Sequence, residues 1–203
     1  MMSSAITAQS VELTPVITKN GPLASSFPDP TTISDEMLYE VVDGRIVQKT
    51  VGVYEVEIAN ILTQFLGNFA RTHGLGRAVV EMIFIIDRDR NLQRRPDVAF
   101  VSHARWPVQR RAPKSAVWDL VPDLVVEVVN PSNTADQVQE KIHEYFMARV
   151  SRVWVVYPRQ KEVYVYASPT QIEVLQLGQE LDGGDLVPGF RLPLAALFED
   201  DAE

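Results

Sequence analysis

The chain has 203 residues, 46% of them hydrophobic and 23% charged, which suits one globular domain with a sizeable core. It contains no cysteine, so disulfide bonds and thiolate metal sites are excluded. Because 27 Asp and Glu residues outnumber 19 Lys and Arg residues, the formal net charge is −8, which argues against a generic nucleic-acid binder.

Residues 1–30 are rich in Ser, Thr and Pro without sustained periodicity, and we interpret them as a flexible arm before a single domain at 31–203. They lack the basic start and apolar segment of a signal peptide. No apolar run in the chain reaches the roughly 20 residues that cross a bilayer. We therefore expect a cytoplasmic protein without membrane contact. At the start of the domain, Ser34 is suited to cap a short helix before Leu38.

The next elements are predicted from a turn and from apolar spacing. The stretch YEVVDGRIV predicts a β-hairpin, since Asp43-Gly44 supplies the positive φ angles of a tight turn. From Val53 to Arg71, apolar residues recur at helical spacing and predict an amphipathic helix that ends near Gly74.

The rest of the chain alternates strands with one more helix. A second helix is expected at Thr134–Val150, and strands are expected at about 78–86, 97–101, 123–129, 152–157, 162–167 and 172–176. This order predicts a mixed α/β fold in which at least two helices pack on a central sheet.

Apolar residues near the carboxyl end predict an assembly. The number of apolar residues in the 163–177 hairpin region is greater than one small sheet face needs: Val163, Val165, Ile172 and Val174. Because a two-fold pair is the commonest assembly, we expect a homodimer.

One segment, residues 88–114, has a charge balance opposite to that of the whole chain. Its eight basic and two acidic residues give a net charge of +6, so the remaining chain carries −14. A local basic patch can engage phosphates even on an acidic protein. We expect nucleic-acid contacts from Arg94, Arg95, Arg110 and Arg111, with a solvated charged loop as the alternative.

Three acids lie in or at the ends of apolar strands: Glu81, Asp97 and Glu127. An ionised carboxylate that is buried without a partner is strongly unfavourable, so Glu127 requires one. Strand side chains alternate between faces, which allows the three acids to converge while their neighbours pack. Carboxylate oxygens are ligands that Mg²⁺ prefers, and a shared Mg²⁺ would stabilise the ionised form of Glu127.

The second predicted helix offers a cation to this cluster. Lys141 flanks the buried stripe that contains Val138 and Tyr145, so its stem can cross apolar surface and present the ammonium to the carboxylates. Water held by a metal, beside a lysine and paired carboxylates, suits phosphodiester hydrolysis.

The segments RRPDVAFV, VVEVVNPSN and KIHEYFMARVSRVWVVYP, in that order, resemble the PD-(D/E)XK nuclease superfamily. More narrowly, the chain is similar to a bacterial family of restriction-endonuclease-like proteins of the Uma type. The resemblance runs from about Thr32 to Phe198 and includes YEVVDGRIV, the HGLG helix end and WVVYP. It implies a mixed, mostly four-stranded central sheet, flanked by helices and extended by extra β-hairpins. It also implies a nuclease that hydrolyses DNA with Mg²⁺, for which Mn²⁺ can substitute.

Carried over by position, the resemblance makes Asp97 and Glu127 the metal-binding acids. The superfamily's usual lysine lies two residues beyond the glutamate, where this chain has Val129. The family's common solution is a lysine on the following helix, and Lys141 occupies that place.

Two further acids match residues that recur in the family. Glu40 is expected at the edge of the active site, and Glu81 is expected among the metal ligands. One position departs from the pattern: Tyr54 stands where many relatives have a histidine.

Other interpretations remain open at this point. A non-catalytic member of the same fold would bind nucleic acid or protein, and a small-molecule hydrolase could use two carboxylates, as glycosidases do. Residue by residue, Glu127 could form a structural ion pair, Asp97 a turn, Lys141 a solvated helix face and Tyr145 part of the core.

Overall fold

The computed structural model describes residues 38–198, so the expected arm and the helix capped by Ser34 lie outside the described residues. No helix within 38–198 is long and apolar enough to cross a membrane. The elements, in chain order, are β1 (Tyr39–Val42), β2 (Arg45–Gln48), α1 (Val53–Thr72), β3 (Gly76–Val80), β4 (Phe84–Asp87), β5 (Leu92–Arg94), β6 (Val98–Ser102), β7 (Leu124–Val128), α2 (Ala135–Met147), β8 (Arg152–Tyr157), β9 (Glu162–Ser168), β10 (Gln171–Leu175), β11 (Glu180–Asp182), β12 (Arg191–Pro193) and α3 (Ala195–Phe198).

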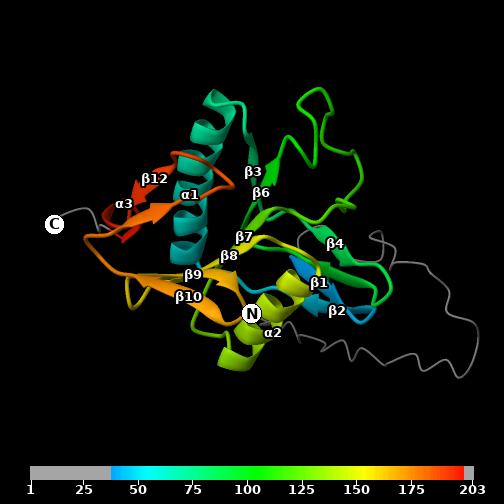
Figure 1. Ribbon diagram of the computed structural model, residues 1–203. Helices are drawn as coiled ribbons and strands as arrows, with labels where there is room; N and C mark the ends of the chain where they lie inside the picture. Colours follow the sequence, from blue (N-terminus) through cyan, green and yellow to red (C-terminus); the bar gives the residue numbers. More distant parts are fainter. Residues whose placement is uncertain (1–37, 199–203) are drawn as a thin grey trace, which may run out of the picture.

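A six-stranded sheet forms the centre of the molecule, in the order β10-β9-β8-β7-β6-β3 (Figure 1). Strands β7 and β8 are parallel and are connected through α2, whereas the other pairs in this sheet are antiparallel. The β9–β10 hairpin extends the sheet beyond β8. The structure therefore confirms the predicted mixed α/β fold.

Both faces of this sheet are buried under helices, as β7 illustrates. Leu124, Val126 and Val128 pack in the core that contains the apolar face of α1, whereas Val125 packs in the core that contains α2. Because strand side chains alternate between faces, Glu127 falls on the α2 side. A strand buried on both faces is an almost continuous apolar run, which explains why a single acid stands out in this segment.

The predicted hairpin and both long helices are confirmed by the structure. Asp43 and Gly44, with φ angles of 48° and 75°, form the tight turn between β1 and β2. Thr134 caps α2: its side chain accepts from the N–H of Gln137, whose own side chain accepts from the N–H of Thr134. The hydroxyl and amide thereby satisfy backbone groups that a helix start leaves unpaired.

The stretch 78–86 differs from the single strand predicted from its apolar run. It forms β3, which pairs with β6, and β4, which pairs with β5 in a different sheet. The chain changes direction at Glu81, whose φ of 51° is left-handed. An apolar run does not distinguish one strand from two, because both bury the same residues.

The second sheet has four strands in the order β2-β1-β5-β4 and includes β5, a strand that was not predicted. Strands β1 and β5 supply the charged residues Glu40 and Arg94, which contact α2. This sheet therefore forms the wall that faces α2 across the candidate site.

The hairpin region expected to form a dimer is partly core. Val163 and Val165 are buried in the α1-side core, so they are not surplus to the fold. Ile172 and Val174 on β10 are 45% and 41% exposed. Of the four residues expected at a dimer interface, only Ile172 and Val174 therefore remain candidates for it.

Candidate active site

The two carboxylates predicted at the centre of the site are neighbours on adjacent strands. Val98 of β6 lies opposite Val126 of β7, and continuing this register places Asp97 opposite Glu127. Since Val98 and Val126 belong to the α1-side core, alternation directs both acids to the α2 side. Both residues are buried. The structure thus brings together the pair of acids expected from the sequence.

Two side chains of α2 contact Glu127 and provide the partners that a buried acid requires. Lys141 Nζ donates to Oε2 at 3.0 Å, and the Tyr145 hydroxyl donates to Oε1 at 2.5 Å. Burial raises the pKa of Glu127 above its ordinary value, and Lys141 counteracts the rise while the Asp97 carboxylate adds to it. Burial lowers the pKa of Lys141, but attraction to Glu127 and Glu40 outweighs burial and raises it. Lys141 is therefore a charged ammonium at neutral pH.

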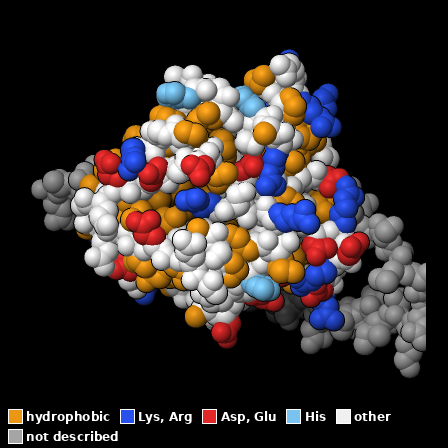
Figure 2. Space-filling view, viewed as in Figure 1, with side chains coloured by type: hydrophobic (Ala, Val, Ile, Leu, Met, Phe, Trp, Pro, Cys, Tyr) orange, Lys and Arg blue, Asp and Glu red, His pale blue; other side chains and the backbone are white. Residues whose placement is uncertain are grey.

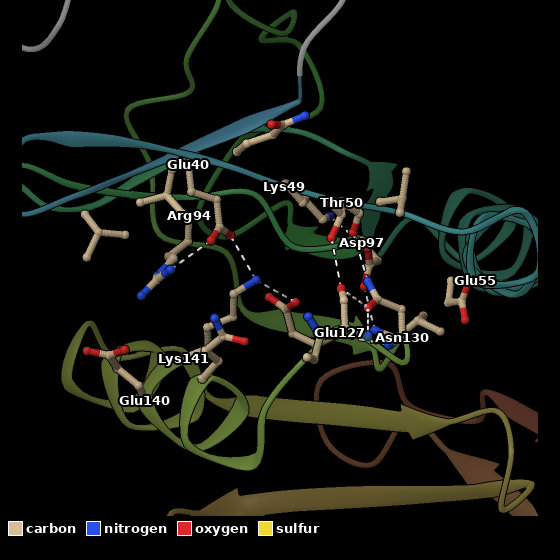
Figure 3. Close-up of a pocket in the computed structure, with 18 residues that line it drawn as sticks. Glu40, Lys49, Thr50, Glu55, Arg94, Asp97, Glu127, Asn130, Glu140 and Lys141 are labelled. Atoms are coloured by element: carbon tan, nitrogen blue, oxygen red, sulfur yellow. Dashed lines mark hydrogen bonds and ion pairs between the residues drawn. The ribbon is translucent and has the colours of Figure 1, made fainter. Parts of the chain in front are cut away.

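Glu40 and Arg94 hold Lys141 from the opposite wall. The Lys141 ammonium stands between the carboxylates of Glu40, at 3.1 Å, and Glu127 (Figure 3). Glu40 also accepts from Arg94 Nη1 at 2.8 Å, and Arg94 Nε donates to Glu144 of α2 at 2.7 Å. Burial raises the pKa of Glu40, but Lys141 and Arg94 outweigh it, so the net pKa lies below the ordinary value. These contacts join the second sheet to α2.

A second lysine, Lys49, follows β2 and contacts the remaining acids. Its Nζ lies 2.7 Å from Asp97 Oδ1 and 2.8 Å from Glu81 Oε2, and it donates to the Arg95 carbonyl oxygen at 2.9 Å. The other Asp97 oxygen, Oδ2, accepts from the Val128 N–H at 2.5 Å. Burial lowers the pKa of Lys49, but the surrounding carboxylates, Asp97 foremost, raise it. Both oxygens of Asp97 thus have a donor within the protein.

A cavity of about 300 Å³ is lined by six of these charged residues: Glu40, Lys49, Arg94, Asp97, Glu127 and Lys141. Figure 3 shows Thr50 and Asn130 on one side of it, and Glu40 and Arg94 on the other. The Asn130 side chain donates to the Thr50 carbonyl oxygen at 2.9 Å, and the hydroxyls of Thr50 and Ser132 are 3.1 Å apart. The loop after β7 is thereby tied to the segment that carries Lys49.

The donor chemistry of the paired acids fits a hard divalent cation. Mg²⁺ is commonly bound by one or two carboxylates together with waters and substrate phosphates, and Asp97 and Glu127 offer such oxygens. Glu81, the third predicted ligand, is instead joined to Asp97 by Lys49. Across residues 38–198, no three His, Cys, Asp or Glu side chains are arranged to hold a metal ion together. Within residues 38–198, Glu81 therefore does not converge with Asp97 and Glu127, and the metal-binding role of these acids stays a prediction.

The four arginines expected to bind phosphates do not form one surface. Arg94 is 4% exposed and its guanidinium is committed to two buried glutamates, which is at odds with a surface contact. Arg95 is partly buried and donates to two backbone carbonyl groups. Arg110 and Arg111 are exposed on the loop between β6 and β7, where the Arg110 guanidinium lies 3.9 Å from the Trp106 ring centroid. Lys and Arg side chains gather on the side that carries this loop and β4 (Figure 2).

Sequence reasoning missed Lys49 and gave Tyr145 too small a role. Lys49 could have been noticed in the sequence because it is the only Lys or Arg between Arg45 and Arg71. Tyr145 is part of the core, as its spacing predicts, and its hydroxyl also contacts Glu127. The signal was its position four residues after Lys141, which places both on one helix face.

Known proteins share this architecture. The model of the family Uma2, described as "Putative restriction endonuclease", matches residues 28–195. A solved structure from Anabaena variabilis ATCC 29413, described as "a putative nuclease belonging to DUF820", matches with a TM-score of 0.69 and 18% sequence identity, covering 79% of this chain and 89% of that one. At that identity the likeness shows a common fold. No curated protein matches the chain.

Proposed function

Since the chain belongs to the Uma2 family, we propose that the cavity is the active site of a divalent-metal-dependent nuclease that hydrolyses phosphodiester bonds in DNA. The observation that carries the proposal is the cross-strand pair of Asp97 and Glu127, with the Lys141 ammonium 3.0 Å from Glu127. Phosphodiester hydrolysis needs groups that bind a cation and groups that stabilise the negative charge developing on the phosphate.

Asp97 and Glu127 are the residues that would hold the cation, Mg²⁺ or its substitute Mn²⁺. When bound, a divalent cation supplies Lewis-acid chemistry at the phosphate and lowers the pKa of coordinated water. Because burial raises the pKa of Glu127, this carboxylate gains more than an exposed one from a neighbouring positive charge.

Lys141 is placed to stabilise the charge that develops on the phosphate. Its side chain is 18% exposed and lines the cavity. Glu40 and Glu127 hold the ammonium from two sides, and the Tyr145 hydroxyl holds Glu127. A charge fixed before the substrate binds needs no reorganisation during the reaction, which is the origin of most electrostatic catalysis.

Arg110 and Arg111 are our candidates for contacts with the DNA backbone. A cavity rich in carboxylates repels phosphates, so a basic surface outside it has to supply the attraction. Both side chains are exposed on the loop between β6 and β7. Arg90 is also exposed, but it already pairs with Asp43 at 3.1 Å and therefore contributes less to DNA binding.

A homodimer completes the proposal, because cutting both DNA strands uses two sites. Ile172 and Val174 share a face of the sheet edge with Tyr157 and Tyr164, whose rings lie 4.7 Å apart, centroid to centroid, at a tilt of 53°. This apolar strip suits a two-fold partner. A dimer mass in sedimentation equilibrium at micromolar concentration is expected, and a monomer mass rejects this part of the proposal.

A non-catalytic member of the fold is the second candidate, and one observation favours it. Each oxygen of Asp97 and Glu127 already has a donor within the protein, so the cluster is satisfied without a metal. In that case the network stabilises the fold, and the protein binds nucleic acid or another protein without cleaving it.

The deciding experiment incubates the full chain with plasmid and single-stranded DNA, with Mg²⁺, with Mn²⁺ and with chelator. We expect cleavage with either metal, none with chelator and none for Asp97→Asn, which keeps the side-chain size and removes its charge. Glu57→Gln, an exposed acid of α1, is the matched control and retains activity. Binding without cleavage supports the non-catalytic member, and cleavage in chelator supports a metal-independent hydrolase.

A further inference from the structure

The ammonium of Lys49 has the surroundings of a bound cation. Four oxygen atoms lie within 2.9 Å of Nζ: Asp97 Oδ1, both carboxylate oxygens of Glu81 and the carbonyl oxygen of Arg95. The Lys49 side chain is 8% exposed, so the protein rather than water provides these contacts. Two carboxylates and a carbonyl group form the kind of donor set that hard metal cations take.

The same contacts use the Asp97 oxygen that a metal would need. Asp97 Oδ2 is engaged by the Val128 N–H, which belongs to the backbone of β7 and does not move independently of the sheet. Oδ1 is engaged by Lys49 alone among the contacts described for residues 38–198. A cation at Asp97 therefore competes with Lys49 for one oxygen.

Lys49 can give up this position without a change of backbone. Its neighbour Thr50 is held by Asn130 and Ser132, so the Lys49 backbone is anchored at the rim of the cavity. The side chain lines that cavity and has a flexible four-carbon stem. The ammonium can thus withdraw into the cavity while the chain around it stays in place.

We propose that Lys49 is a tethered cation that occupies Asp97 Oδ1, the oxygen needed by a divalent metal at Asp97 and Glu127, and that it withdraws when the metal binds. It neutralises Asp97 and Glu81 in the metal-free protein and so permits the fold to form without metal. It also weakens metal binding, because the metal must displace it. This inference rests on the proposed metal-dependent function, since it requires that a divalent cation binds at Asp97.

The test measures Mn²⁺ binding to the full chain in the absence of DNA, by titration calorimetry and by the electron paramagnetic resonance signal of unbound Mn²⁺. Lys49→Gln is expected to bind Mn²⁺ about 10–100-fold more tightly than the parent, the range over which groups touching metal ligands alter affinity. Arg45→Gln is the control: it removes one positive charge from an exposed position on β2, away from the cavity. It should leave the Mn²⁺ affinity unchanged.

Thermal unfolding provides a second readout. Lys49→Gln leaves the buried Asp97 and the half-buried Glu81 without their ammonium, so its melting temperature without metal should fall below that of the parent. Added Mn²⁺ should raise the melting temperature of Lys49→Gln more than that of the parent. If Lys49→Gln does not fold, Glu81→Gln is compared with Lys49→Gln/Glu81→Gln, a pair that again differs only in Lys49. The double variant should bind Mn²⁺ more tightly.

The outcomes separate this inference from the proposed function. Mn²⁺ binding that is equally tight with and without Lys49, or equally tightened by Arg45→Gln, overturns the role of Lys49 and leaves the metal-dependent nuclease standing. Absence of Mn²⁺ binding in every variant overturns both.

Discussion

Removal of the Tyr145 hydroxyl tests whether its contact stabilises a buried, charged Glu127. Tyr145→Phe keeps a ring that is fully buried and removes the donor that lies 2.5 Å from Glu127 Oε1. A hydrogen bond to a charged group contributes about 1.5–3 kcal/mol, and one between neutral groups contributes about 0.5–1.5 kcal/mol. We therefore expect the free energy of unfolding to fall by about 2 kcal/mol where Glu127 is ionised, and by about 1 kcal/mol where it is protonated.

The pH dependence of this loss follows from the pKa of Glu127. Burial raises the folded-state pKa above the ordinary value of 4.5. A group with a raised pKa holds its proton more tightly in the folded state. Its contribution to stability is present below 4.5 and is lost as the pH rises through the raised value. Tyr145→Phe removes a donor to the charged form and raises this pKa further, so the variant and the parent differ most at alkaline pH.

The assay is urea unfolding of four proteins over a pH series: the parent, Tyr145→Phe, Glu127→Gln and the double variant. This double-mutant cycle isolates the interaction between the two side chains. Tyr166→Phe, at another buried tyrosine of the same core, is the matched control and should show no comparable pH dependence. The reasoning is refuted if Tyr145→Phe loses the same free energy in the parent and Glu127→Gln backgrounds at every pH.

The remaining predictions concern catalysis, DNA binding and assembly. Lys141→Ala should lower the cleavage rate about 10²–10³-fold, the typical effect of losing one charge-stabilising group. Adding Val129→Lys should restore part of that rate, since Val129 and Lys141 line one small cavity; cleavage by folded Lys141→Ala at the parent rate contradicts a catalytic role. Replacing Arg110 and Arg111 by Gln should reduce the slope of log K against log salt by about two, and an unchanged slope identifies the loop as merely solvated. Ile172→Lys should shift the proposed dimer toward monomer in sedimentation, and an unshifted mass contradicts that interface.

Features that depend on residues close together in the chain could be predicted from the sequence. The spacing of apolar residues predicts α1, and Asp43-Gly44 predicts the β1–β2 turn, because helix periodicity and turn conformation are local properties. The pair of Asp97 and Glu127 could also be predicted, since an acid in or beside an apolar strand is conspicuous. Lys141 could be predicted as well, from its place beside the buried stripe of the second helix and from the resemblance to a nuclease family, and the structure places it on Glu127.

Features that depend on how the two large sheets meet could not be predicted in this way. The run 78–86 divides at Glu81 because β4 joins β5, and pairing between strands leaves no mark on the apolar pattern of either. Arginine usually lies at the surface of a protein. Arg94 is instead buried, because the second sheet places it between Glu40 and Glu144.

Lys49 illustrates the same limit at the site itself. It is 32 residues away in sequence from Glu81, and it contacts Glu81 and Asp97 because folding brings the residue after β2 beside the start of β6. The sequence shows which side chains are charged, but the packing of distant segments determines with which residues they form ion pairs. The sequence thus specifies which groups are available to this site, and the packing of the two sheets specifies which acid each lysine neutralises.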